Sequence, residues 1–310
     1  MATPYYCAAA SLAAGEKVFG TAVNADIWLL IECPEPWGVS AVKDSSMPQA
    51  VKDHLAGLTR TSRRIRVQLI KQESRTRWPR QVFVGFTRQH QPYLVNSHIN
   101  SYDELLQLNA EDLLERRVAP EHHNVGLPIH LVCTHGRHDK CCAKFGFATY
   151  KFMHEIAPGN VWQTSHVGGD RFASNVISFP SGVYYGHVDN DVARAIIDAE
   201  TRKEIYLERY RGRTCFGPHG QIAEYFVRRE SGIRDMEALN REWVKPSENR
   251  SHWTGLFTSE DGARQHIVKY EQHKAAFSAL LTCHATEEKS PFEYRLLKYE
   301  ESARVLGPAA

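Results

Sequence analysis

The sequence predicts an α/β protein made of two tandem thioredoxin-like units, each a mixed sheet flanked by helices, followed by a small α+β extension with antiparallel strands. Two observations lead to this prediction. The order strand, helix, strand, hairpin, helix occurs twice, and a cysteine, Cys33 or Cys133, ends the first strand of each round. Helices that alternate with strands pack on the faces of a sheet. We therefore expect units at 1–118 and 119–213, and the extension at 214–310.

The first round follows from its hydrophobic pattern. Its first strand is an apolar run ended by Pro34, and the next strand alternates apolar and polar residues. Ser101 followed by Glu104 is a capping box, which predicts the start of a helix. The expected elements are strands at 27–33, 65–70, 82–86 and 93–96, and helices at 47–58 and from 101.

The second round repeats this order. Its hairpin turns around Pro180 and Gly182, and its last helix carries Val192 and Ile196 at helical spacing. The expected elements are strands at 129–133, 161–165, 175–179 and 183–188, and helices at 140–156 and 190–210.

The remaining residues follow a different pattern. The stretch 221–230 is expected to be helical, and 265–270, 276–282 and 292–299 are expected to be strands. Turn residues between these strands favour an antiparallel meander. The extension contains no motif that we associate with a cofactor.

Composition and charge limit the kinds of partner that we expect for this protein. Lys and Arg total 38 against 36 Asp and Glu, a formal net charge of +2. Such a balance gives no general attraction to nucleic acid or to anionic lipid. The first residues do not form a secretory signal, and no run approaches the roughly 18 apolar residues of a membrane span. We therefore expect a cytoplasmic protein with no nucleic-acid or membrane partner.

The seven cysteines do not fit a disulfide framework, because their number is odd and their spacing irregular. Cys133, Cys141 and Cys142 crowd into ten residues. This segment starts where a buried strand ends and finishes where a helix begins, and a helix N-terminus favours the thiolate form that binds metal. Adjacent side chains on a helix diverge by about 100°. We therefore expect only one of the two adjacent cysteines to face a site.

A second segment follows the third element of the same unit and is expected to lie beside the first. His166 offers an imidazole, and Asp170 offers either a ligand or a hydrogen-bond acceptor. Gly168 and Gly169 let the backbone pass close to a bulky group. Arg171 is placed to donate to sulfide or thiolate, or to pair with Asp170. We expect Gly168, Gly169 and Arg171 to contact a cofactor.

Three motifs occur in one order: Cys-Thr-His-Gly-x-x-Asp-x-Cys-Cys at 133–142, Ser-His-x-Gly-Gly-x-Arg-Phe-Ala-x-Asn at 165–175, and Pro-x-Gly-x-x-Tyr-Gly at 180–186. Together they resemble the sucrase/ferredoxin-like family of thioredoxin-like proteins. The resemblance extends over roughly residues 5–235. Despite the family's name we expect no glycosidase, because no carboxylate pair can be placed around a sugar.

The resemblance implies a [2Fe-2S] cluster held by two cysteines and two histidines spaced His-x-x-x-His. By position, its ligands would be Cys133, Cys142 and His166, and the second histidine falls on Asp170. Three possibilities stay open at this point. Asp170 is itself the fourth metal ligand, or Cys141 or His187 completes the set, or the cluster is absent.

We therefore expect an intracellular electron-transfer protein rather than a stand-alone enzyme. Because no Gly-x-Gly-x-x-Gly follows a strand, we expect electrons to come from a protein redox partner or a small reductant. One alternative is a metal-free thiol-disulfide protein that uses Cys133 with Cys141 or Cys142. Another is a binding module stabilised by zinc.

Overall fold

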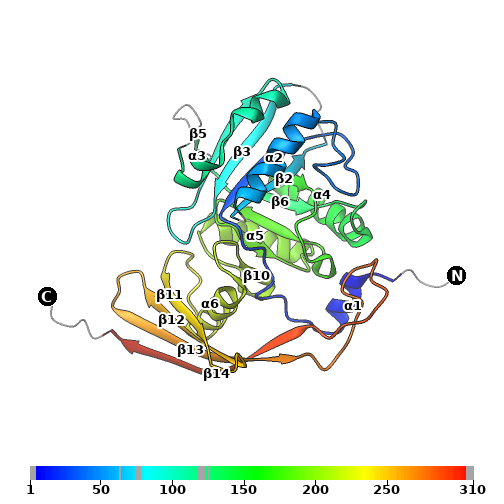
Figure 1. Ribbon diagram of the computed structural model, residues 1–310. Coiled ribbons are helices and arrows are strands. Elements are labelled where there is room, and N and C mark those ends of the chain that lie inside the picture. Colours follow the sequence, from blue (N-terminus) through cyan, green and yellow to red (C-terminus); the bar gives the residue numbers. More distant parts are fainter. Residues whose placement is uncertain (1–4, 63, 74–77, 118–122, 125, 305–310) are drawn as a thin grey trace.

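The computed structural model describes residues 5–304 except 63, 74–77, 118–122 and 125. These described residues form two sheets (Figure 1). The larger is a mixed sheet of strand order β10-β9-β8-β6-β7-β2-β1-β3-β4-β5, and the smaller is an antiparallel meander of β11-β12-β13-β14. The predicted α/β class and the antiparallel C-terminal sheet are confirmed.

The elements of the first half match the expected order. They are β1 (Ile27–Glu32), α2 (Gln49–Thr61), β2 (Ile65–Lys71), β3 (Arg80–Phe86), β4 (Tyr93–Ile99), the 3-10 helix η1 (Tyr102–Gln107), α3 (Ala110–Glu115) and β5 (His123–Asn124). The capping box at Ser101 and Glu104 is confirmed. Every residue of β1 is buried, as is typical of a central strand covered on both faces.

The second half also follows the expected order. It comprises β6 (Ile129–Cys133), the π-helix η2 (Cys142–Gly146), α4 (Phe147–Ile156), β7 (Val161–Thr164), η3 (Asp170–Phe172), β8 (Val176–Phe179), β9 (Val183–Tyr185), α5 (Asn190–Thr201), η4 (Leu207–Arg209) and β10 (Tyr210–Arg213). The short helix α1 (Cys7–Ala13) precedes both halves.

The two halves of the large sheet share one strand order, β2-β1-β3-β4 in the first and β7-β6-β8-β9 in the second. In each half the first pair is parallel and the later pairs are antiparallel. The halves meet where β2 and β7 pair antiparallel, with Ile70 opposite Thr164 and Lys71 opposite Gln163. Strands from both expected units, 1–118 and 119–213, therefore belong to one continuous sheet.

One expected helix is too long. The helix predicted at 190–210 ends at Thr201 as α5. Lys203 has a left-handed backbone with φ of 57°, which turns the chain. The N–H of Ile205 then donates to the carbonyl of Arg234 instead of to a helical carbonyl. Ile205 is buried, so its apolar side chain reflects a packed loop and not a helix face.

The extension also differs in part from expectation. It consists of α6 (Pro218–Ser231), β11 (Leu239–Pro246), β12 (His252–Ser259), β13 (Arg264–Lys274) and β14 (Phe292–Ala303). The strand predicted at 276–282 is wrong, because this stretch belongs to the connection between β13 and β14. Tertiary contacts hold that connection against the rest of the protein: the Tyr5 hydroxyl donates to the carbonyl of Leu280. Figure 1 shows the connection running toward α1, at the right of the view.

Helix α6 joins the two sheets. Its Phe226 packs in one buried cluster with Val192 and Ile196 of α5 and with Phe257 and Val268 of the small sheet. Burial of this shared apolar surface stabilises the position of the extension against the second half.

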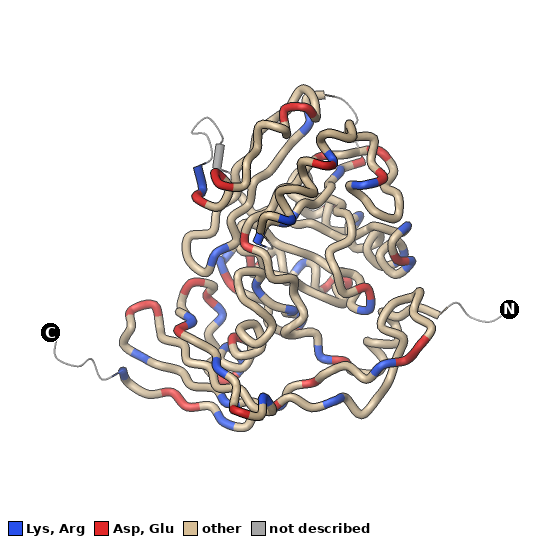
Figure 2. Tube along the Cα trace, in the orientation of Figure 1, with Lys and Arg blue, Asp and Glu red and all other residues tan. Residues whose placement is uncertain are grey.

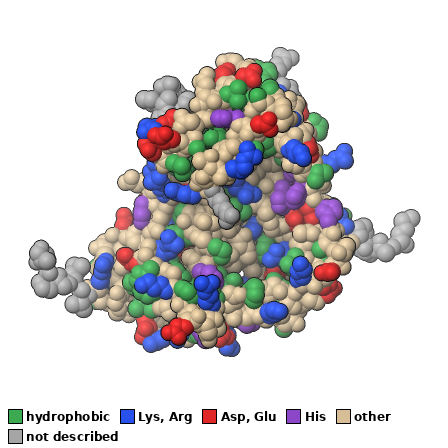
Figure 3. Space-filling model, viewed as in Figure 1, with side chains coloured by type: hydrophobic (Ala, Val, Ile, Leu, Met, Phe, Trp, Pro, Cys, Tyr) green, Lys and Arg blue, Asp and Glu red, His purple; other side chains and the backbone are tan. Residues whose placement is uncertain are grey.

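Charges are spread over the molecule. Figure 2 shows basic and acidic residues interspersed along the trace, and the face in Figure 3 carries both kinds side by side. No helix within the described part of the chain combines the length and the apolar character needed to cross a membrane.

Candidate metal centre

The start of the helix that follows β6 places Cys142 beside Cys133. Cys142 opens the π-helical turn η2, and such turns are frequent at functional sites. Gly146 closes that turn against the end of β6: a Cβ atom at this position would lie 1.9 Å from the carbonyl oxygen of Cys133. Only glycine lets the helix approach this closely. Both cysteines are almost fully buried.

The loop after β7 brings the second segment to the same place. Gly168 and Gly169 have φ of 87° and 81°, left-handed values that side chains rarely adopt. They turn the chain so that the Oδ1 atom of Asp170 lies 3.9 Å from the Sγ atom of Cys142 and 3.1 Å from the Nδ1 atom of His166. Ligand atoms of Cys133, Cys142 and His166 lie within 4.8 Å of one another. Cys133, Cys142 and His166 therefore lie together, and Asp170 lies beside Cys142 and His166.

A buried arginine, which our sequence analysis did not single out, holds this loop. The Nη1 atom of Arg211 donates to the carbonyl of Gly168 at 3.0 Å and to Oδ1 of Asn175 at 2.7 Å. Asn175 in turn donates to the carbonyl of Gly169. A Cβ atom on Gly169 would lie 2.5 Å from Nη2 of Arg211, so this glycine is also required by the arginine. Burial lowers the pKa of Arg211 to about 10.

Two further histidines from the cysteine segment line the site. The ring of His138 stacks on His166 with centroids 3.7 Å apart, and His138, His166 and Asp170 form a second group of possible metal ligands. The Nδ1 atom of His135 accepts from the N–H of His166 at 3.2 Å, and its Nε2 atom lies 2.6 Å from the carbonyl oxygen of Gly38. His138 was missed as a candidate ligand, although its place between Cys133 and Cys142 was visible in the sequence.

The two buried thiols form a polarised pair. A hydrogen bond from Cys142 lowers the pKa of Cys133 well below its usual range and raises the pKa of Cys142. His166 lowers the pKa of Cys133 further, against the effect of burial. Burial raises the pKa of Asp170. The hydrogen bond from Cys142 and the neighbouring His166 therefore both favour the thiolate form of Cys133, which is the form that binds metal.

The donor set fits an iron or zinc centre. Thiolate and imidazole are ligands of both metals, and a carboxylate oxygen can complete the set. The Nε2 atom of His166 accepts from the N–H of Gly168, which leaves the proton of a neutral ring on Nδ1. That Nδ1 atom is buried and makes no hydrogen bond of acceptable geometry, although Asp170 lies close. A metal ion would give this buried nitrogen a partner, with release of its proton.

The other candidates from the sequence lie elsewhere. The Nε atom of Arg171 donates to Oε1 of Glu16 at 2.7 Å, and Glu16 also accepts from Ser11. Arg171 thus ties the loop to the N-terminal segment. The Sγ atom of Cys141 lies 3.3 Å from that of Cys283 in another group of possible metal ligands, so of the two adjacent cysteines Cys142 alone is grouped with Cys133.

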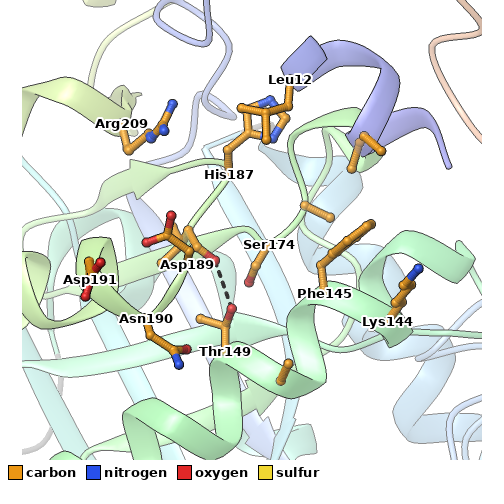
Figure 4. Close-up of a pocket in the computed structure, with 15 residues that line it drawn as sticks. Leu12, Lys144, Phe145, Thr149, Ser174, His187, Asp189, Asn190, Asp191 and Arg209 are labelled. Atoms are coloured by element: carbon orange, nitrogen blue, oxygen red, sulfur yellow. Dashed lines mark hydrogen bonds between the residues drawn. The ribbon is translucent and has the colours of Figure 1, made fainter.

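His187 lies beside a pocket rather than beside Cys133. The pocket has a volume of about 640 Å³ and is bordered by α1, α4 and α5 (Figure 4). The ring of His187 packs against Phe172 and lies 3.4 Å from the hydroxyl of Ser11. Burial and nearby arginines lower the pKa of His187 to about 4. No group of possible metal ligands among the described residues includes His187.

Fold and site together define a mixed α/β protein with buried cysteine and histidine groups that could hold metal. The chain belongs to the sucrase/ferredoxin-like family, whose sequence model matches residues 18–212. The match runs from ahead of β1 into β10 and so contains both halves of the large sheet and the Cys133 site. No match was found among curated proteins or among solved structures.

Proposed function

We propose that this protein is an intracellular electron carrier with a [2Fe-2S] cluster bound by Cys133, Cys142, His166 and Asp170. The observation that carries the proposal is that the ligand atoms of Cys133, Cys142 and His166, from two segments, lie within 4.8 Å of one another, with Asp170 beside Cys142 and His166. Family membership supports it. When bound, such a cluster would supply a one-electron redox couple.

We further propose that each half of the large sheet is a thioredoxin-like unit and that the second holds the cluster. The shared order of one parallel and two antiparallel pairings supports this assignment. Cys133 ends the central strand of the second half, and the helix after it begins at Cys142.

The burial of the residues around the site favours electron transfer over thiol-disulfide exchange. Cys133 and Cys142 are 1% and 0% exposed, whereas the side chain of His166 is 21% exposed. A protein redox partner would therefore approach the imidazole edge formed by His166 and His138. The buried guanidinium of Arg211 offsets negative charge in this region without reaching the surface.

A thiol-disulfide function is the second candidate, because the lowered pKa of Cys133 favours a reactive thiolate. Thiol exchange needs access to the attacking sulfur, however. The burial of both sulfurs makes this candidate the weaker one.

The deciding experiment is the visible spectrum, with iron and acid-labile sulfide analysis, of protein purified without oxygen. We expect charge-transfer bands with about two irons and two sulfides per chain. Cys142→Ser should remove both, and Cys215→Ser is the matched control, because Cys215 belongs to no metal group of the described residues. A colourless protein without iron, even after reconstitution, would contradict the proposal. Zinc that is lost in Cys133→Ser would instead favour the zinc-stabilised module.

A further inference from the structure

Three cysteines form a second cluster on the other side of the same helix start. The Sγ atoms of Cys7, Cys141 and Cys283 are 3.6, 3.3 and 3.5 Å apart in pairs. They come from α1, from the start of the helix after β6, and from the connection between β13 and β14. Two of them, Cys7 and Cys283, lie outside the residues that match the family.

These distances suit a single metal ion. Zn–S bonds of about 2.3 Å in a tetrahedral site place the sulfurs about 3.8 Å apart. The three observed separations are only slightly shorter, so small side-chain rotations would admit the ion. They are far longer than the S–S bond of about 2.05 Å in a disulfide. Each sulfur touches both others, whereas the cysteines of an iron–sulfur cluster are divided among different irons.

A buried carboxylate completes the arrangement. Asp139 is fully buried, and its Oδ1 and Oδ2 atoms accept from the backbone N–H groups of Cys141 and Cys283 at 2.7 and 3.0 Å. One of its oxygens lies within 4.8 Å of all three sulfurs. Asp139 thus orients two of the cysteines. It also offers an oxygen as the fourth ligand beside the three sulfurs, since a carboxylate oxygen that accepts one hydrogen bond keeps a second lone pair.

The surroundings suit an anionic complex. Three thiolates and a carboxylate around a divalent cation carry a net negative charge. The ammonium groups of Lys140 and Lys144 lie over the ring of Tyr6, at 5.4 and 4.0 Å from its centroid, next to Cys7. Tyr6 and Lys140 directly precede Cys7 and Cys141 in the chain, so these two cations gather at segments that supply cluster ligands and would offset part of its charge.

We propose that Cys7, Cys141, Cys283 and Asp139 form a structural site for zinc or a similar thiophilic divalent ion. Binding would release the thiol protons and join three distant parts of the chain. Cys7 and Cys283 are 276 positions apart, so the ion would close a very long loop, which is the case where a cross-link restricts the unfolded chain most. The ion would hold α1 and the β13–β14 connection against the helix that carries Cys142.

The test is a titration of metal-free protein with Co²⁺ in the Cys133→Ser background, where the first site is disabled. We expect one equivalent to bind, with the visible absorption of tetrahedral thiolate coordination, and Zn²⁺ to displace it. Adding Cys283→Ser should weaken Co²⁺ binding at least tenfold, whereas adding Cys215→Ser should leave it unchanged. No tetrahedral absorption, or equal binding by the Cys283→Ser variant, would overturn the proposal.

Two further measurements guard against a folding artefact. Zn²⁺ should raise the unfolding temperature of Cys133→Ser, and this rise should be lost when Cys283→Ser is added. Thiol counting under denaturing conditions should find all the cysteines of anaerobically purified Cys133→Ser reduced, and a missing pair would indicate a disulfide and overturn the metal site. The Cys283→Ser single variant should keep the visible absorption of the Cys133 site, so the two proposals fail separately.

Discussion

Cys33 and Cys133 occupy the same place in the two halves of the large sheet, yet their surroundings differ. Cys33 follows the central strand β1, and its thiol donates to Oε2 of Glu35 at 3.2 Å inside an apolar cluster. Burial raises the pKa of Cys33 to about 11. Cys133 ends the central strand β6, but Cys142 and His166 lower its pKa well below the usual range. The same strand position thus carries a thiol with a raised pKa in one half and, in the other, a thiol with a lowered pKa beside two further possible metal ligands.

The difference comes from the two segments that approach the strand end. In the second half the helix starts with a cysteine and the loop after β7 carries His166 and Asp170. In the first half Trp37 approaches instead, and its Nε1 atom donates to the carbonyl of Cys33. A strand end therefore becomes a site only when its neighbours supply ligands.

The largest expected effect is on metal content. Cys133→Ser should abolish bound iron and visible absorption, because serine supplies no thiolate. Cys33→Ser should keep both and cost at most about 1–3 kcal/mol of stability, since it buries a hydroxyl in an apolar cluster but leaves it Glu35 as a hydrogen-bond acceptor. Iron analysis and denaturant unfolding check the pair. Retained iron in Cys133→Ser, or lost iron in Cys33→Ser, would remove the distinction between the halves.

The helices after the two central strands offer the next comparison. Gly146→Ala should destabilise the protein by about 1–3 kcal/mol, because the new methyl group would overlap the carbonyl of Cys133. Gly57→Ala in α2 meets nothing within 4 Å and should stabilise by about 0.5–1 kcal/mol. Denaturant unfolding of both variants measures the difference. Equal effects would mean that the close helix approach in the second half is not required.

A pH effect distinguishes the two central strands. His130 of β6 stands three residues before Cys133, where β1 has Leu30. Burial lowers the pKa of His130 from 6.5 to about 4, so between these values the unfolded chain binds more protons than the folded one. His130 should therefore reduce stability as pH falls from about 6.5 to about 4, by at most about 1.4 kcal/mol per pH unit. His130→Leu should flatten this part of the profile of unfolding free energy against pH, and an unchanged slope would contradict the assignment.

The smallest expected effect concerns the fourth ligand of the second half. Asp170→His replaces a negative ligand with a neutral one and should raise the reduction potential of the cluster. It should also steepen the dependence of the potential on pH, because an added imidazole can take up a proton on reduction. Redox titration at several pH values measures both effects. Asp191→His, on the exposed start of α5, is the control, and a potential of Asp170→His equal to or below that of the parent would exclude Asp170 as a ligand.

The sequence was sufficient where local pattern determines structure. Apolar runs located the strands of the large sheet other than β5 and β10, and the cysteine and histidine motifs identified Cys133, Cys142, His166 and Asp170 as candidates. It was insufficient where distant contacts decide. Cys7 and Cys283 meet Cys141 only in three dimensions, so no local pattern marks their group. Arg211 was hidden because no strand was expected at β10: the predicted helix ended at residue 210, at the first residue of that strand.

Two strands of the extension were missed for a related reason. The sequence Leu-Asn-Arg-Glu-Trp-Val-Lys-Pro of β11 is mostly polar and shows no clean alternation. Its conformation is set by pairing with β12, where a bulge shifts the register between Arg241 and Trp243. A strand of this kind can be predicted only when the position of its hairpin partner is already known.

The pairing of β2 with β7 determines how either half of the large sheet would behave on its own. Each of these strands would be an edge strand if its half stood alone. Its unpaired N–H and C=O groups could then form hydrogen bonds with a strand of another molecule. In the intact chain each covers the other through two residue pairs. Separating the halves would thus expose two matched edges, and a fragment that carries only the second would be prone to pair with copies of itself and aggregate.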